Sequence, residues 1–128
     1  CKQVDTNSKQ KIMFKYFTME EFACQETGEC FMKEEFIHAL DALRHECGFP
    51  FKITSGYRSK THSLEVKKPG GPGKHTAGIA ADIAVSNGAH RFIIVANAIK
   101  LGFSGVGIAR SFVHCDIRDT TSVIWTYQ

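Results

Sequence analysis

The sequence predicts a single α+β domain in which helices cover one side of a mainly antiparallel sheet. The length of 128 residues is enough for one hydrophobic core and too short for two domains. Hydrophobic residues make up 43% of the chain, and ten Phe residues supply bulky side chains for that core. Helix-like segments come first and strand-like segments follow, with one further helix among the strands, which is typical of α+β folds.

The first half of the chain predicts two helices and one strand. We expect residues 1–16 to form a polar tail and residues 17–128 to form the domain. Thr18 followed by Glu21 is a capping-box pattern, so a short helix begins within residues 17–24. Residues 51–55 alternate and predict a strand. The clearest helix covers residues 31–48, where Gly48 is a natural stop and apolar residues recur at helical spacing: Phe36, Ile37, Leu40, Leu43 and Cys47.

The second half predicts a long loop followed by strands around one helix. Residues 59–74 are polar and rich in Gly and Pro, and loops of this length usually border a functional site. Residues 79–85, 103–108 and 112–118 are each expected to form a strand. Asn87 is the expected N-cap of a helix that Gly102 ends. The side chains expected to face inward from this helix are Phe92, Ile93, Ala96 and Ile99.

Charge and composition narrow the classes of partner. The net charge is only +3, and no basic stripe with interleaved aromatic residues argues for a nucleic-acid partner. No apolar run approaches the roughly 18 residues that a membrane span needs. The first ten residues are hydrophilic and are not a secretory signal. Positive charge gathers at Arg58, Lys60, Lys67, Lys68 and Lys74, either as a solvated loop or as a rim that attracts an anionic substrate.

Five cysteines leave at least one thiol unpaired within the chain. Cys24 and Cys30 are close enough in sequence to form a small disulfide loop, and an alternative is that they bind a second metal together with Cys47. No CxxC pair supports that site, so buried or free thiols are the favoured interpretation.

Two predicted strands carry polar residues where apolar ones are expected. Asp82 lies between Ala80 and Ala84 on one strand face, where an unpaired carboxylate would be costly to bury. Gly78 allows a sharp turn, so His75 can fold back toward Asp82.

The second strand places His114 and Asp116 together on one face. The alternate residues Val113 and Cys115 then point into the core, which makes Cys115 a core thiol and not a nucleophile. Two imidazoles and one carboxylate, His75, Asp82 and His114, form a set typical of a catalytic zinc ion with one open position. Ligand chemistry alone also allows iron, manganese or cobalt.

Four segments in this order resemble the zinc D-alanyl-D-alanine peptidases: FTMEEFAC, ITSGYRS, HTAGIAAD and GFSGVGIARSFVHCDIR. That superfamily includes bacterial cell-wall carboxypeptidases and endopeptidases, vancomycin-resistance dipeptidases and phage endolysins, and the hedgehog signalling domain shares its fold. The resemblance extends from about Phe17 to Trp125, and it is the combination of segments that is specific.

The resemblance implies a role for each candidate residue. His75, Asp82 and His114 would bind one Zn²⁺ per chain. Arg58 would bind substrate or stabilise the transition state, and Ser55 would help to shape that corner. Trp125, with Tyr127, is expected to line the substrate cleft, the alternative being edge packing near the terminus.

The chain departs from the family pattern in three places. Relatives often carry a catalytic carboxylate a few residues before the last zinc histidine, and residues 108–113 contain none. Asp116 is therefore the candidate general base, and its alternative role is to orient a ligand histidine. Gly73 replaces a frequent Ser and Ser63 replaces a frequent Asn, which bears on substrate preference more than on metal binding.

These features predict a zinc metallopeptidase that hydrolyses peptide bonds in peptidoglycan stem peptides, as a D,D-carboxypeptidase or an endopeptidase. Such an enzyme would act as a monomer on the bacterial cell wall, from the periplasm, after secretion or by phage delivery. The alternative is a non-catalytic, zinc-containing module that binds the cell wall or a partner, which the missing upstream carboxylate supports. A metal-free scaffold is a third hypothesis.

Overall fold

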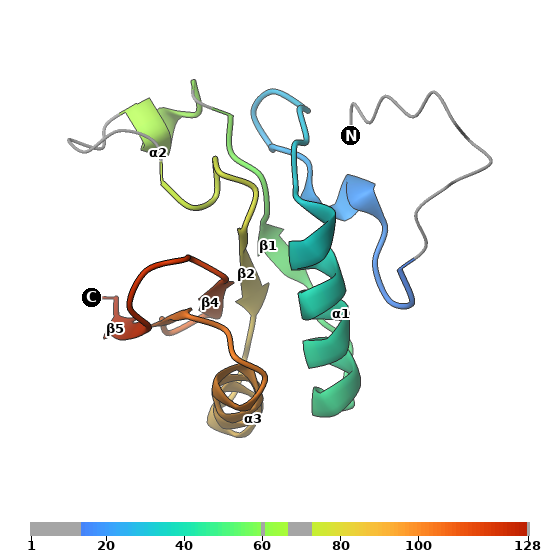
Figure 1. The fold of residues 1–128 in the computed structure, drawn as a ribbon, viewed down its shortest axis with the longest axis vertical. Helices are drawn as coiled ribbons and strands as arrows, with labels where there is room; N and C mark the ends of the chain where they lie inside the picture. Colours follow the sequence, from blue (N-terminus) through green and yellow to red (C-terminus); the bar gives the residue numbers. More distant parts are fainter. Residues whose placement is uncertain (1–13, 60, 67–72, 128) are drawn as a thin grey trace.

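The computed structural model of the chain describes residues 14–59, 61–66 and 73–127. Its five-stranded sheet has the order β1-β2-β4-β3-β5 (Figure 1). The strands are β1 (Ile53–Ser55), β2 (Ala80–Ala84), β3 (Gly105–Ile108), β4 (Phe112–Asp116) and β5 (Val123–Thr126). Neighbouring strands run antiparallel up to β3, which pairs with β5 in parallel. The predicted class, α+β with a mainly antiparallel sheet, is confirmed.

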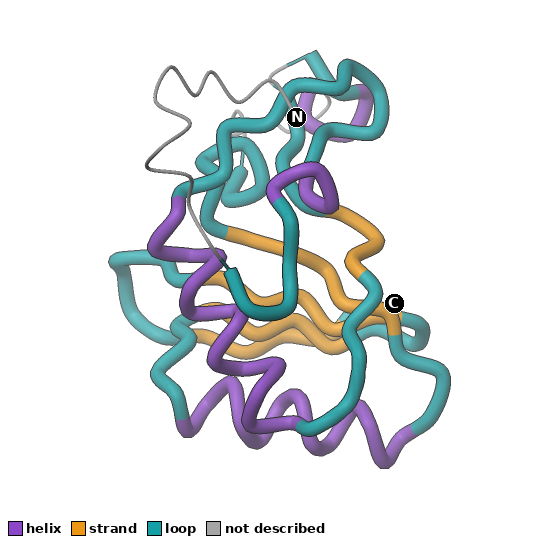
Figure 2. The backbone as a smooth tube through the Cα atoms, turned by 90° about the vertical axis from the view of Figure 1, so that its right-hand side faces the viewer, coloured by secondary structure: helices purple, strands orange, loops and turns teal. Residues whose placement is uncertain are grey.

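The two long helices lie on one side of this sheet. They are α1 (Glu34–Cys47) and α3 (Gly88–Lys100), and α3 contacts α1, β3 and β4. In Figure 1 α1 runs vertically beside the strands while α3 is seen end-on below them. In Figure 2, which views the molecule from the α1 side, the purple tube of this helix passes in front of the orange strands. A single-turn helix, α2 (Ser63–Val66), lies apart from both. None of the helices in the described ranges is long and apolar enough to cross a membrane.

Local signals explain where the first helical segments begin and end. The backbone N–H of Thr18 donates to the Glu21 carboxylate at 2.8 Å, and the turn that follows, Met19–Phe22, is a 3-10 helix. Helix α1 ends at Gly48, whose φ of 78° is left-handed and costs glycine little. The inward face of α1 is the predicted one, because its fully buried residues are Phe36, Ile37, Leu40 and Leu43.

The predicted inward face of α3 is wrong. Ile94 and Ala98 are fully buried, whereas Phe92 is 73% exposed and Ile99 is 58% exposed. The helix is apolar at successive positions from Phe92 onward, so more than one stripe satisfies helical spacing. Contacts with α1 and β4 decide which stripe is buried, and those contacts are not local in sequence.

All four predicted strands are shorter than expected, and a fifth strand was not predicted. β1 begins at Ile53 and not at residue 51, although Phe51 is still buried in the core. β5 was not predicted at all. It is held to the β3 edge by hydrogen bonds from Val123 N–H to the Ser104 carbonyl (2.8 Å) and from Tyr127 N–H to the Ile108 carbonyl (2.9 Å). The run of β-branched and aromatic residues in this segment, VIWT, is the sequence signal that marks it as a strand.

We expect Phe36→Ala to lower the free energy of unfolding by about 3–5 kcal/mol, because the ring is fully buried and its loss leaves a cavity. Phe92→Ala removes the same atoms from an exposed position and is expected to change stability by less than about 0.5 kcal/mol. Urea unfolding of both variants measures the difference. Equal losses would contradict the helix faces described above.

Candidate metal centre

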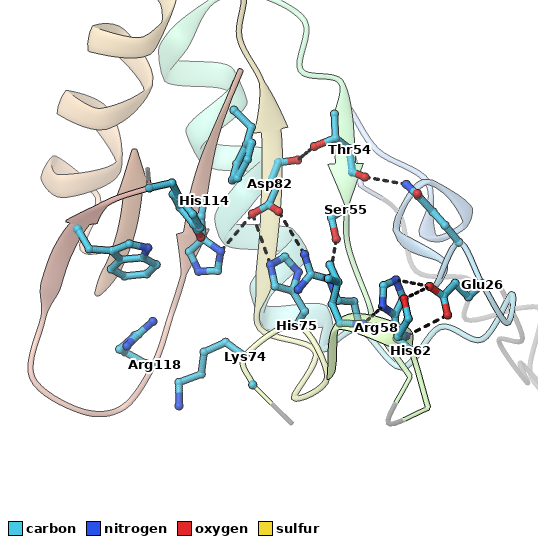
Figure 3. Close-up of a pocket in the computed structure, with 17 residues that line it drawn as sticks. Glu26, Thr54, Ser55, Arg58, His62, Lys74, His75, Asp82, His114 and Arg118 are labelled. Atoms are coloured by element: carbon cyan, nitrogen blue, oxygen red, sulfur yellow. Dashed lines mark hydrogen bonds and ion pairs between the residues drawn. The ribbon is translucent and has the colours of Figure 1, made fainter. Parts of the chain in front are cut away.

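Strands β2 and β4 bring Asp82 and His114 directly opposite each other in the antiparallel register. Neighbours on both strands, Ile83 and Val113, are fully buried in the core. Because side chains alternate along a strand, Asp82 and His114 therefore project from the sheet face that α1 and α3 do not cover. Nδ1 of His114 lies 3.1 Å from Oδ1 of Asp82 (Figure 3).

His75 reaches the same carboxylate oxygen from the turn before β2. Gly78 has a φ of 78°, and its N–H donates to the His75 carbonyl at 3.2 Å, which closes the turn. Nε2 of His75 then lies 3.4 Å from Oδ1 of Asp82. The three side chains offer ligand atoms that all lie within 4.8 Å of one another, and all three are buried. The convergence that the sequence predicted is confirmed.

The hydrogen bonds around this group leave a place for a cation. Nδ1 of His75 is 2.8 Å from the Gly56 carbonyl, which can only accept, so this nitrogen carries the proton. Nε2 of His114 is 2.7 Å from the Asp116 carboxylate and donates to it. The other nitrogen of each neutral ring therefore turns a lone pair toward the Asp82 oxygen. Two imidazole nitrogens and one carboxylate oxygen facing one another fit Zn²⁺.

In the metal-free protein, protons stabilise the same arrangement. Burial alone would raise the pKa of Asp82, but hydrogen bonds from His114 and His75 outweigh burial and hold that pKa well below its usual range. Burial alone would lower the pKa of His114, but hydrogen bonds to Asp116 and Asp82 outweigh it and raise that pKa. A metal ion and an added proton on the imidazole therefore compete for the same space.

Asp116 lies behind His114 and is fully buried. Arg118 donates to both of its oxygens, from Nε at 2.9 Å and from Nη2 at 2.6 Å, and these bonds outweigh burial and hold the pKa of Asp116 low. The carboxylate fits against β3 because residue 105 is Gly, where an added Cβ would overlap its oxygens. The Asp116 side chain does not line the cleft that opens over the three candidate ligands. The sequence had predicted that this carboxylate reaches a water molecule in the cleft as the general base.

Arg58 and Ser55 lie on the β1 side of the group. Ser55 is opposite Asp82 in the β1–β2 register, and its hydroxyl accepts a hydrogen bond from Nε of Arg58 at 3.2 Å. Nη2 of Arg58 lies 3.6 Å from Oδ2 of Asp82. The guanidinium is therefore fixed beside the candidate metal ligand, close to where the sequence placed it.

A cleft of about 940 Å³ opens over these side chains. Its β1 side includes Ser55 and Arg58, and its β5 side includes Trp125, whose ring centroid is 5.1 Å from that of His114. All the predicted site residues except Asp116 thus line it.

Sequence reasoning missed Glu26 and His62, which also line this cleft. The Glu26 carboxylate accepts a hydrogen bond from Oγ of Ser63 at 2.7 Å and lies 3.4 Å from Nε2 of His62. These residues are 36 positions apart in the chain, so only the tertiary fold brings them together.

The cysteines do not form part of a metal site among the described residues. Cys24, Cys47 and Cys115 are free thiols, and Cys115 is fully buried, as predicted. Within the described ranges, the group of side chains placed to share a metal ion contains no cysteine. Cys1 lies outside these ranges.

Comparison with known proteins identifies the family. No curated protein matches the chain significantly. The model of one family, Peptidase M15, matches residues 15–116, a segment that contains His75, Asp82 and His114 and ends at Asp116. The match covers most of the chain and agrees with both the mixed fold and the possible metal group. The chain therefore belongs to the peptidase M15 family.

Proposed function

We propose that this chain is a zinc-dependent peptidase that hydrolyses peptide bonds in peptidoglycan stem peptides. The observation that carries the proposal is the convergence of His75, Asp82 and His114 beneath an open cleft. Three protein ligands with room for a further ligand are typical of catalytic zinc sites and not of structural ones. Membership of the family supports a peptidase, and the resemblance of the quoted motifs to cell-wall enzymes supports the stem-peptide substrate.

In the proposed reaction, some residues orient the zinc ligands and Arg58 stabilises developing negative charge. When bound, a zinc ion supplies Lewis acidity, which polarises a carbonyl group and makes water a better nucleophile near neutral pH. The Gly56 carbonyl and the Asp116 carboxylate hold the two imidazole rings in the orientation that ligation requires. Arg58, fixed by Ser55 and Asp82, presents positive charge where the carbonyl oxygen of the peptide becomes negative.

The contacts of Asp116 support its role as a positioning residue. A general base must come within about 3 Å of the proton that it removes. Asp116 is fully buried, and its hydrogen bonds to Arg118 and His114 occupy both oxygens. We therefore favour the second of the two roles that the sequence suggests, in which Asp116 orients His114.

Digestion of purified muropeptides, followed by mass spectrometry, tests the proposal. Zinc-loaded protein is expected to release new peptide fragments, chelator-treated protein is expected to release none, and added zinc is expected to restore the products. The masses also identify the bond that is cut and separate a carboxypeptidase from an endopeptidase. Absence of any product from zinc-loaded protein would contradict the proposed activity.

One observation favours the alternative of a zinc-containing binding module. In the described part of the chain, the carboxylates that line the cleft are Asp82 and Glu26, and both already have partners. A module of this kind would bind one zinc ion and retain muropeptides without cleaving them. The same digestion, combined with a binding measurement on the zinc-loaded protein, distinguishes the two functions.

A further inference from the structure

The β5 side of the cleft is built largely from residues beyond the segment that the family model matches. Arg118, Trp125 and Tyr127 line the cleft but follow residue 116, where the match ends. They form a wall in which the Arg118 guanidinium lies 5.1 Å from the Trp125 ring centroid. Gly107 makes room for this wall, because an added Cβ there would lie 2.7 Å from the indole. Membership of the family therefore does not say which part of a substrate the β5 side of the cleft recognises.

Lys74 adds a second positive charge to the same side. Figure 3 shows Lys74 and Arg118 on one side of the His75–Asp82–His114 group and Arg58 on the other. Arg118 is paired with Asp116, and Arg58 lies beside Asp82. The half-buried Lys74, in contrast, has no carboxylate within ion-pair distance among the residues that the structure describes.

A half-buried cation at the wall of a cleft is suited to an anionic ligand. Its attraction for a carboxylate exceeds that of a fully solvated lysine, because the surrounding protein lowers the effective dielectric constant. The Trp125 indole, which lines the same cleft, offers a flat apolar surface for the carbon atoms that carry such a group. Positive charge and aromatic surface together fit a peptide residue that bears a free carboxylate.

We propose that Lys74 is a specificity-determining residue that binds a free carboxylate of the substrate on the β5 side of the metal centre. This inference rests on the proposed function, since it describes how a stem peptide is recognised in the same cleft. In a stem peptide whose third residue is lysine, two carboxylates have the required chemistry, namely the internal α-carboxylate of the γ-linked D-glutamate and the carboxylate at the C-terminus. The test separates these sources.

The chain contains a single Trp, which is Trp125, so its fluorescence reports on ligands in this cleft. We would titrate metal-free and zinc-loaded protein with a stem pentapeptide and with two analogues, one amidated at the internal carboxylate and one at the C-terminus. The wild type is expected to bind the parent peptide about tenfold more tightly than one of the two analogues. That analogue identifies the carboxylate that Lys74 contacts.

Lys74→Gln is expected to weaken binding of the parent peptide about tenfold and to abolish this preference, while zinc content stays unchanged. Lys100→Gln is the matched control, because Lys100 pairs with Glu46 on the helical side and does not line the cleft. The inference would be overturned if Lys74→Gln kept the peptide preference of the wild type. It would also be overturned if the substitution weakened the binding of all three peptides equally. Because binding to the metal-free protein is read without turnover, failure of the inference remains distinguishable from absence of peptidase activity.

Discussion

His114→Ala is expected to abolish zinc binding and peptidase activity together. The imidazole supplies one of three ligand atoms. The two that remain, from His75 and Asp82, are too few to hold the ion. Loss of a residue that only orients a ligand reduces metal affinity about 10- to 100-fold, so loss of the ligand itself is expected to cost more than about 100-fold. Metal analysis of purified protein measures the result, with one zinc per chain expected in the wild type and none in the variant.

A histidine outside the cleft provides the control for this experiment. His38→Ala removes an exposed imidazole from α1 that contacts Phe14 and does not line the cleft. It is expected to keep full zinc content and full activity. If His114→Ala retained the zinc of the wild type, the ligand set proposed for this chain would be incorrect. A wild type that is purified without metal and is indifferent to added zinc would instead support the scaffold hypothesis.

The sequence singled out His75, Asp82 and His114 because the direction of each side chain is set by local geometry. Alternation in β2 and β4 decides which face Asp82 and His114 occupy, and the left-handed Gly78 turns His75 back toward them. What the residues alone did not give is the register that puts Asp82 opposite His114, since strand pairing joins residues 32 positions apart. Ligand chemistry grouped the three residues, the resemblance of the motifs agreed with that grouping, and in the structure the three side chains converge.

The features that the sequence missed depend on contacts between distant segments. Spacing alone places Asp116 on the same strand face as His114, but it does not show that Arg118 and Gly105 enclose the carboxylate behind the ring. The buried stripe of α3 was misassigned for a similar reason, because Ile94 and not Phe92 meets the core. The residues of β5 carry a local strand signal, but its parallel pairing with β3 joins segments that are distant in the chain.

Asp116→Asn separates the two roles that are possible for this carboxylate. If Asp116 orients His114, the neutral amide holds the imidazole less firmly, and zinc affinity is expected to fall about 10- to 100-fold. Activity would then return toward the wild-type level when zinc is raised to saturation. If Asp116 is the general base, zinc affinity would change little, and kcat would stay low at every zinc concentration. Activity measured across a zinc titration, with zinc affinity determined independently, tells the two results apart.

Asp119→Asn is the matched control, because Asp119 is exposed and lies only three residues further along the chain. It removes the same charge without touching His114 and is expected to leave both zinc affinity and kcat unchanged. Arg118 is left beside a neutral partner in Asp116→Asn, so urea unfolding of the metal-free protein checks that the fold persists. A low kcat at saturating zinc in a folded Asp116→Asn protein would show that burial in the free enzyme does not exclude this carboxylate from the chemical step.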